Sequence, residues 1–208
     1  MTCPEPFCYA AKPHQRRHGP SGYANYQEYK PWLRDDFVFR CVYCLEREVW
    51  YPSGADAFSV EHVVPRSKDT SLTCKYENLV YACIRCNSLR REVELLDPTN
   101  AAFADHLKVA DDGVVHALSV RGQDIVDQLH LNSETAIRTR NGIFRVLRLK
   151  RRLPEDHEVD DLFRETFGYP MDMPDLTKKK PPSGNSREDM TDSCFHVRRL
   201  RGELSATY

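Results

Sequence analysis

Three short stretches dominate this sequence: CVYC at residues 41–44, VEHVVPRS at 60–67 and ENLVYACIRCNSLR at 77–90. The first and third each contain a C-x-x-C pair, and together the pairs supply four thiolates, the ligand set of a tetrahedral structural zinc. The ligands predicted from this pattern are Cys41, Cys44, Cys83 and Cys86. Because residues 45–82, 38 positions, separate the pairs, and a simple zinc ribbon has fewer, a further structural unit is expected between them.

The insert and the residues after it predict an order of strand, loop, knuckle and helix. Ala57–Val64 is rich in β-forming residues, and Tyr76–Tyr81 leads into the second C-x-x-C turn, which polar helix-forming residues follow. Four polar residues are spaced along these elements so that they are expected to converge: Glu61, His62, Asn78 and Asn87. Carboxylate and amide oxygens suit a hard cation, and an imidazole suits proton transfer near neutral pH.

Taken jointly, the three stretches resemble the zinc-containing branch of the HNH endonuclease family, over about a quarter of the chain. The resemblance implies a ββα-metal core, in which a β-hairpin and a helix hold one catalytic divalent cation. It implies that His62 is the general base and that Asn78 orients it. Glu61 and Asn87 would bind the cation, Mg²⁺ or Mn²⁺. Glu61 stands where Asp is more usual, so direct and water-mediated metal contact both stay open.

The function that this resemblance implies is hydrolysis of DNA phosphodiester bonds to products with 5′-phosphates. Four basic residues flank the site and are expected to contact nucleic acid: Arg66, Lys68, Arg90 and Arg91. The stretch from LLDPTN (95–100) to LHLNSETAIRTR (129–140) is also similar to the region after the motif in bacterial HNH proteins of anti-phage defence. This similarity implies an effector nuclease of a defence system, with a partner ATPase or another defence subunit.

Two alternatives stay open. One is a zinc-stabilised module that binds nucleic acid or assembles with a partner without cutting. The other is a nuclease that acts on RNA or only after a partner activates it. The formal net charge of −1 keeps the second open, because the chain as a whole attracts nucleic acid weakly.

The expected fold class is α+β, with a ββα-metal core and a four-cysteine structural zinc, flanked by an N-terminal helix and C-terminal helices. Apolar spacing predicts helices over Tyr23–Asp36, disturbed at Pro31, and over Asn132–Arg152 and Pro154–Phe167, with a strand over Gly113–Val120. The expected regions are an N-terminal arm (1–22), the nuclease domain (23–97), a mixed strand and helical region (98–169) and a flexible tail (170–208). The tail is expected because the chain from residue 171 to 193 is polar around KKKPPSGN.

Several cysteines and histidines lie outside the two pairs. A second metal site is conceivable in the arm, from Cys3, Cys8, His14 and His18. Their spacing fits no common zinc finger, so a partly mobile arm is the preferred interpretation. No role is assigned to Cys74, Cys194 or His196.

Two further groups have both a structural and a functional interpretation. Tyr26, Tyr29 and Trp32 have helical spacing, which favours packing in the core over stacking on bases. Residues 138–152 contain no acidic residue. The basic side chains in this window are expected either to contact the phosphates of a nucleic acid or to pair with the acidic helix that follows: Arg138, Arg140, Arg145, Arg148, Lys150, Arg151 and Arg152.

The bulk composition is that of an ordinary globular protein, with 40% hydrophobic and 29% charged residues. It contains no apolar run long enough to cross a bilayer, so no membrane association is expected. The first 22 residues lack the apolar stretch of a secretory signal, which predicts a cytoplasmic protein whose cysteines are reduced.

Overall fold

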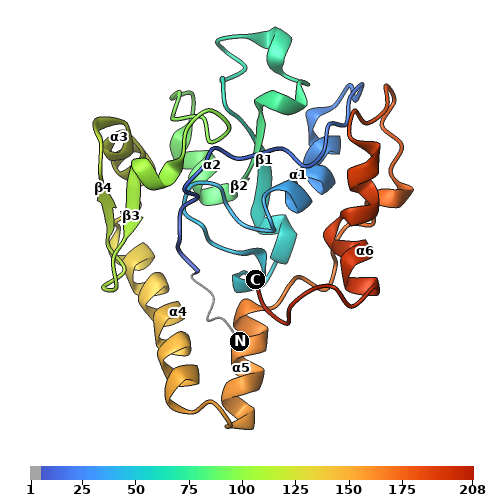
Figure 1. Ribbon diagram of the computed structural model, residues 1–208. Helices are drawn as coiled ribbons and strands as arrows, with labels where there is room; N and C mark the ends of the chain where they lie inside the picture. Colours follow the sequence, from blue (N-terminus) through green and yellow to red (C-terminus); the bar gives the residue numbers. More distant parts are fainter. Residues whose placement is uncertain (1–5) are drawn as a thin grey trace.

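A two-stranded antiparallel sheet lies at the centre of the molecule (Figure 1). Its strands, β1 (Phe58–His62) and β2 (Leu79–Cys83), pair along their full length. The structure is a computed structural model and describes residues 6–208. α2 (Ile84–Arg90) follows β2 directly and packs against both strands. The α+β class is therefore confirmed, and the β-hairpin and helix that the family resemblance implies are present.

The N-terminal helix covers this core. A 3-10 turn, η1 (Tyr26–Tyr29), leads into α1 (Lys30–Asp36), which contacts both strands. Tyr29 and Trp32 are buried, which confirms that they belong to the core, whereas Tyr26 is only half-buried. The helix predicted over Tyr23–Asp36 is thus divided, with a 3-10 turn up to Tyr29 and an α-helix from Lys30. Pro31 lies in the first turn of α1, where a backbone N–H has no intrahelical partner to lose.

The region after the core begins with a small hairpin, β3 (Leu107–Val109) and β4 (Val115–Ala117), followed by α3 (Val120–Gln128). The strand predicted over 113–120 is shorter than expected. β4 ends at Ala117 because α3 begins close behind it. The Ser119 hydroxyl caps α3 by accepting a hydrogen bond from the Gly122 amide at 3.0 Å.

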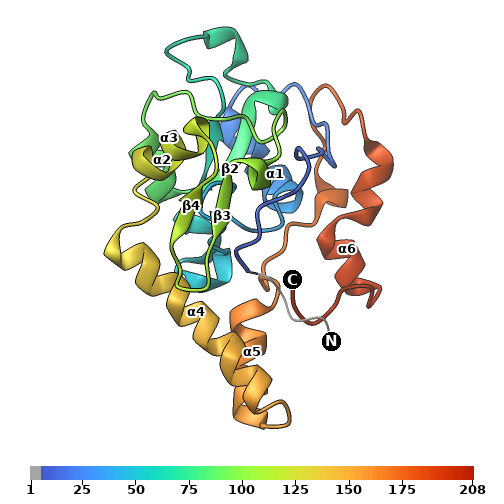
Figure 2. The same ribbon diagram turned by 60° about the vertical axis from the view of Figure 1, so that its left-hand side comes forward.

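α4 (Glu134–Arg152) and α5 (His157–Phe167) form an antiparallel pair that projects from one end of the molecule (Figure 2). Leu147, Phe163 and Phe167 form the buried seam between them. The acid-free window on α4 has mixed roles: Arg140 is 2% exposed and donates to the carbonyls of Gly113 and Leu131, whereas Lys150 pairs with Asp160 at 2.9 Å.

The C-terminal segment differs from the flexible tail that was expected. It contains α6 (Phe195–Leu200), and the side chains of Leu176, Cys194 and Phe195 are buried. Residues 183–186 exchange backbone hydrogen bonds with residues 19–21 of the N-terminal arm. The arm thus supplies partners for the backbone of this segment, and a polar composition does not reveal such pairing.

The remaining regular elements are short 3-10 helices. They are η2 (Glu48–Trp50), η3 (Gly54–Ala57), η4 (Thr70–Leu72), η5 (Tyr76–Asn78), η6 (Phe103–Asp105), η7 (Leu176–Lys178) and η8 (Glu188–Ser193). Within residues 6–208, none of the helices combines the length and the apolar character needed to traverse a bilayer.

Candidate active site and zinc centre

The two C-x-x-C turns meet beside the central sheet. Their four sulfur atoms lie within 4.8 Å of one another, and all four cysteines are buried and form no disulfide: Cys41, Cys44, Cys83 and Cys86. Tetrahedral thiolates about 2.3 Å from a zinc ion lie about 3.8 Å from one another, and the Cys44 and Cys83 sulfurs are 3.7 Å apart. The residues present therefore fit a structural zinc.

Local backbone geometry builds each turn. In the first, Leu45 has a φ of 63°, and the Cys41 amide donates to the Glu46 carbonyl at 2.8 Å, so the chain folds back on itself. In the second, the Cys83 sulfur accepts from the Cys86 amide and caps α2. The Val42 amide donates to the Tyr81 carbonyl, which ties the first turn to β2.

A polar cleft of about 360 Å³ lies between β1, α2 and the loop after β1. Its walls include three of the four predicted catalytic residues and one residue from the N-terminal segment, Tyr26. The full lining is Tyr26, Val60, Glu61, His62, Pro65, Arg66, Ser67, Asn87, Arg90, Arg91 and Glu92. A larger cavity of about 570 Å³ lies between residues 6–9, the β3–β4 hairpin and α4, but it is mainly apolar and lacks the predicted catalytic residues. The polar cleft is therefore the candidate site.

Glu61 is buried at the end of β1 and uses only one of its two carboxylate oxygens. Oε1 accepts hydrogen bonds from Arg90 Nη1 at 2.8 Å and from the His62 amide at 2.6 Å. Oε2 is buried without a hydrogen-bond partner in the described part of the chain. Burial raises the pKa of Glu61, and the Arg90 charge opposes the rise. A buried acceptor left over in a polar cleft fits a cation ligand.

Arg90 differs from its expected role as a nucleic-acid contact. It is 1% exposed, because its guanidinium pairs with Glu61 and its Nη2 donates to the Val63 carbonyl at 2.5 Å. Arg90 thus fixes the Glu61 carboxylate and the loop that leaves β1. Although Arg90 belongs to the wall of the cleft, its side chain is too buried to serve as an open contact for a phosphate backbone.

His62 is held in one tautomer. Its Nε2 lies 3.0 Å from the Thr73 carbonyl oxygen, which can only accept, so Nε2 carries the proton and Nδ1 has the lone pair. Burial lowers the pKa of His62; the Thr73 hydrogen bond opposes this shift, and the charges of Arg66 and Arg90 add to it. A neutral imidazole with an available Nδ1 is what a general base requires.

Asn78 is connected to His62 through the backbone of the loop after β1, a connection that the sequence did not indicate. Its Oδ1 accepts from the Val64 amide at 2.8 Å, and its Nδ2 donates to the carbonyls of Val64 and Leu72. These bonds fix the loop in which Thr73, next to Leu72, offers its carbonyl to His62. An orienting role for Asn78 thus passes through the backbone of the loop.

Asn87 lies in the middle of α2 and lines the same cleft as Glu61. Its Nδ2 donates to the Ser59 hydroxyl at 2.7 Å, and its Oδ1 is left as a potential metal ligand. Since Ser59 and Glu61 are two residues apart on β1, their side chains share a face of the sheet. The structure thus brings Glu61 and Asn87 to one side of the cleft.

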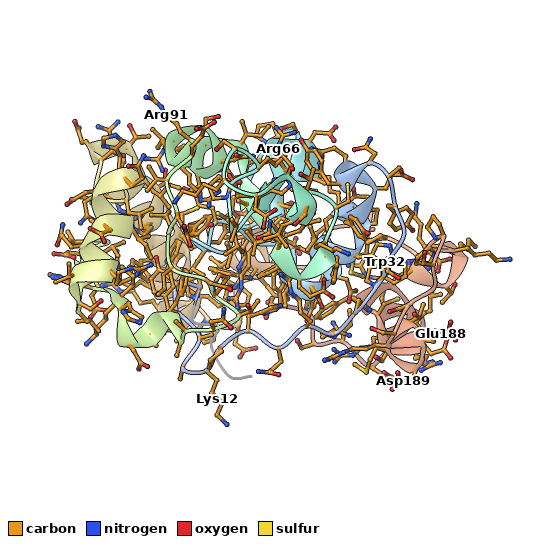
Figure 3. The ribbon with its side chains drawn as sticks, turned by 90° about the horizontal axis from the view of Figure 1, so that it is seen from above. Lys12, Trp32, Arg66, Arg91, Glu188 and Asp189 are labelled. Carbon is orange, nitrogen blue, oxygen red and sulfur yellow. The ribbon has the colours of Figure 1, made fainter. Side chains whose placement is uncertain are left out.

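The other predicted nucleic-acid contacts lie at the surface. Arg66 is exposed and its guanidinium lies over the Tyr26 ring, 5.1 Å from the centroid. Lys68 is exposed and pairs with Glu94 at 2.8 Å. Arg91 is exposed and points away from the protein (Figure 3). These three side chains can reach a phosphate backbone beside the cleft.

The suggested second metal site does not form from the described residues. His14 stacks on Phe37 with 4.2 Å between ring centroids, and His18 Nε2 lies 2.8 Å from Asp35. Cys3 lies outside the described residues. In the described part of the chain, the four paired cysteines are the group of three or more Cys, His, Asp or Glu side chains that could hold a metal ion.

Comparison with known proteins gives the class of the site. Residues 41–91 match the family model described as HNH endonuclease, so the chain contains an HNH endonuclease domain. Over 101 residues the chain is 29% identical to the Septu protein PtuB of Bacillus thuringiensis. The alignment covers 45% of this chain and 37% of that protein, so it spans little more than a third of the relative's length. No solved structure matches the chain.

Proposed function

We propose that this protein is a metal-dependent endonuclease that hydrolyses DNA in the cleft between β1 and α2. Glu61 and Asn87 would hold the divalent cation, Mg²⁺ or Mn²⁺, and the four cysteines would hold zinc. The observation that carries the proposal is the buried Glu61 Oε2, which lacks a hydrogen-bond partner in the described chain and lies one residue from a neutral histidine. A cation at this position would neutralise the charge that develops on the phosphate and on the leaving oxygen.

The protein's own groups would perform the proton transfer. His62 takes a proton from a water molecule at Nδ1, while its Nε2–H remains on the Thr73 carbonyl. Asn78 keeps that carbonyl in place through the loop, and Arg90 keeps the Glu61 carboxylate turned so that Oε2 faces away from the ion pair. Arg66, Lys68 and Arg91 would contact the phosphates on either side of the cut bond.

We further propose that the nuclease is an effector of anti-phage defence that works with an ATPase or another subunit. The similarity to the Septu protein PtuB supports this setting. The near-neutral charge of the chain supports dependence on a partner for tight DNA binding.

The test is cleavage of supercoiled plasmid by the purified zinc-loaded protein. We expect nicked or linear DNA with Mg²⁺ or Mn²⁺ and intact plasmid when no divalent cation is added to the buffer. The ends should be ligatable without kinase treatment, because they carry 5′-phosphates. A structured RNA of equal length is the comparison substrate. Cleavage of RNA alone would replace DNA as the substrate, and cleavage of neither would favour the zinc-stabilised binding module.

A further inference from the structure

We propose that Tyr26, which lies outside the matched domain, is a positioning residue that holds both His62 and Arg66 at the cleft. Tyr26 belongs to η1, fifteen positions before the first residue of the HNH match. The inference rests on the proposed nuclease function, because it concerns the residues assigned to the base and to phosphate contact. It implies that the domain spanning 41–91 does not contain the whole active site.

The Tyr26 ring contacts two functional groups at once. Its centroid lies 4.7 Å from that of the His62 imidazole, with the rings at 65°, an edge-to-face arrangement. The Arg66 guanidinium lies 5.1 Å from the same centroid, a cation–π contact. Tyr26 is half-buried and lines the cleft with His62 and Arg66. One ring therefore fixes the relative positions of the base and of an exposed cation.

His62 needs this second support. The hydrogen bond from Nε2 to Thr73 holds one atom of the ring, and a single hydrogen bond leaves the ring some freedom to tilt about its Cβ–Cγ bond. The Tyr26 ring blocks this rotation from one side. With both contacts in place, Nδ1 keeps one direction in the cleft, which proton transfer from a water molecule requires.

The two supports of His62 are tied to each other. Tyr29, at the end of η1, is buried, and its hydroxyl donates to the Cys74 carbonyl at 3.1 Å. Cys74 follows Thr73, whose carbonyl holds His62, so η1 and the loop form one unit. At its other end, η1 is capped by Asn25, whose side chain accepts from the Gln27 amide at 3.0 Å. Tyr26 is thus presented on a turn that is fixed at both ends.

The aromatic ring makes these contacts, which predicts a graded effect of substitution. Tyr26→Phe keeps the ring and should retain kcat and KM within about twofold. Tyr26→Leu removes the face on which Arg66 lies and the edge beside His62, so kcat should fall by about tenfold or more and KM should rise. Tyr23→Leu is the matched control, since Tyr23 packs on Tyr29 in the same segment.

The kinetic test uses the full-length zinc-loaded protein and plasmid cleavage. In the Arg66→Ala background, Tyr26→Leu should no longer raise KM but should still lower kcat. A general loss of folding would not affect kcat and KM separately in this way. Zinc content and the melting curve show whether each variant is folded. The inference is overturned if folded Tyr26→Leu keeps the wild-type kcat. It is overturned equally if Tyr26→Phe loses as much activity as Tyr26→Leu.

A second readout does not depend on catalysis. The ring current of an aromatic side chain shifts the NMR signals of protons beside it, so the His62 imidazole signals should move in Tyr26→Leu. They should stay close to their wild-type positions in Tyr26→Phe and Tyr23→Leu. Unmoved His62 signals in Tyr26→Leu would overturn the inference even in an active enzyme. If the signals move as expected while the wild type cleaves no nucleic acid, the contact stands and the proposed function fails.

Discussion

The ion pair between Arg90 and Glu61 gives the sharpest stability prediction. The two side chains are 1% and 6% exposed, and Arg90 Nη1 lies 2.8 Å from Glu61 Oε1. Arg90→Met removes the charge and keeps much of the volume, so the Glu61 carboxylate is left buried with only the His62 amide as donor. Breaking a buried ion pair on one side costs about 3–5 kcal/mol. We expect the free energy of unfolding to fall by that amount.

Urea unfolding measures this change. A loss of about 3–5 kcal/mol should lower the urea midpoint by about 1–2 M at an unchanged slope. Arg91→Met is the control, because Arg91 is the exposed neighbour and its replacement should change stability by less than about 0.5 kcal/mol. The double variant Glu61→Gln with Arg90→Met carries neither charge, so it should be more stable than the sum of the single losses predicts. The reasoning is refuted if Arg90→Met is as mild as Arg91→Met, or if the two losses simply add.

Three further predictions concern other parts of the molecule. Cys83→Ser should abolish zinc binding and cooperative folding, because zinc binding to such sites contributes about 10–16 kcal/mol; retained zinc with a normal melting curve would contradict this. Burial and nearby arginines lower the pKa of His14 to about 4. The unfolded chain therefore binds a proton that the native protein does not between about pH 6.5 and pH 4, and stability falls as the pH falls through that window. His14→Phe should remove about 2 kcal/mol of the stability difference between pH 7 and pH 5 in urea unfolding, and an unchanged difference would contradict the account. Asp35→Ala removes the acceptor of the Phe195 amide, so the C-terminal segment should be cut faster in limited proteolysis, whereas unchanged cutting would show that this bond does not hold it.

The metal-binding motifs could be predicted from sequence because their geometry is local. The two cysteines of a C-x-x-C turn can bind one metal whatever surrounds the turn. The spacing alone therefore pairs Cys41 with Cys44 and Cys83 with Cys86. Glu61 and Asn87 could be placed together for a related reason: a short hairpin followed at once by a helix leaves few ways to arrange their side chains.

Residues whose role depends on tertiary partners could not be assigned in this way. Arg90 and Arg91 are adjacent and chemically identical, yet one is buried against Glu61 and the other faces solvent. Asn78 donates to backbone carbonyls of a loop, and a sequence does not show where such carbonyls point. Tyr26 has the helical spacing of a core residue, and its contact with His62 comes from the packing of η1 on β1.

The C-terminal segment shows the same limit at the level of the fold. Its prolines, lysines and glycines are typical of a flexible chain, but Asp35 accepts a hydrogen bond from the Phe195 amide at 2.7 Å and also contacts His18. One buried carboxylate thus joins α1, the arm and the C-terminal helix. Long-range pairing of this kind leaves no local pattern. The domain boundaries expected from sequence remain predictions.

The most direct test of the nuclease account is the cleavage rate of His62→Ala on supercoiled plasmid with Mg²⁺ or Mn²⁺. Removing a general base typically costs about 10²–10⁴-fold in rate, so cleavage should fall by that factor while zinc content and the melting curve stay as in the wild type. His116→Ala, at an exposed position on β4, is the matched control and should cleave normally. Wild-type cleavage by folded His62→Ala would contradict the account, because the imidazole would then have no part in activating water.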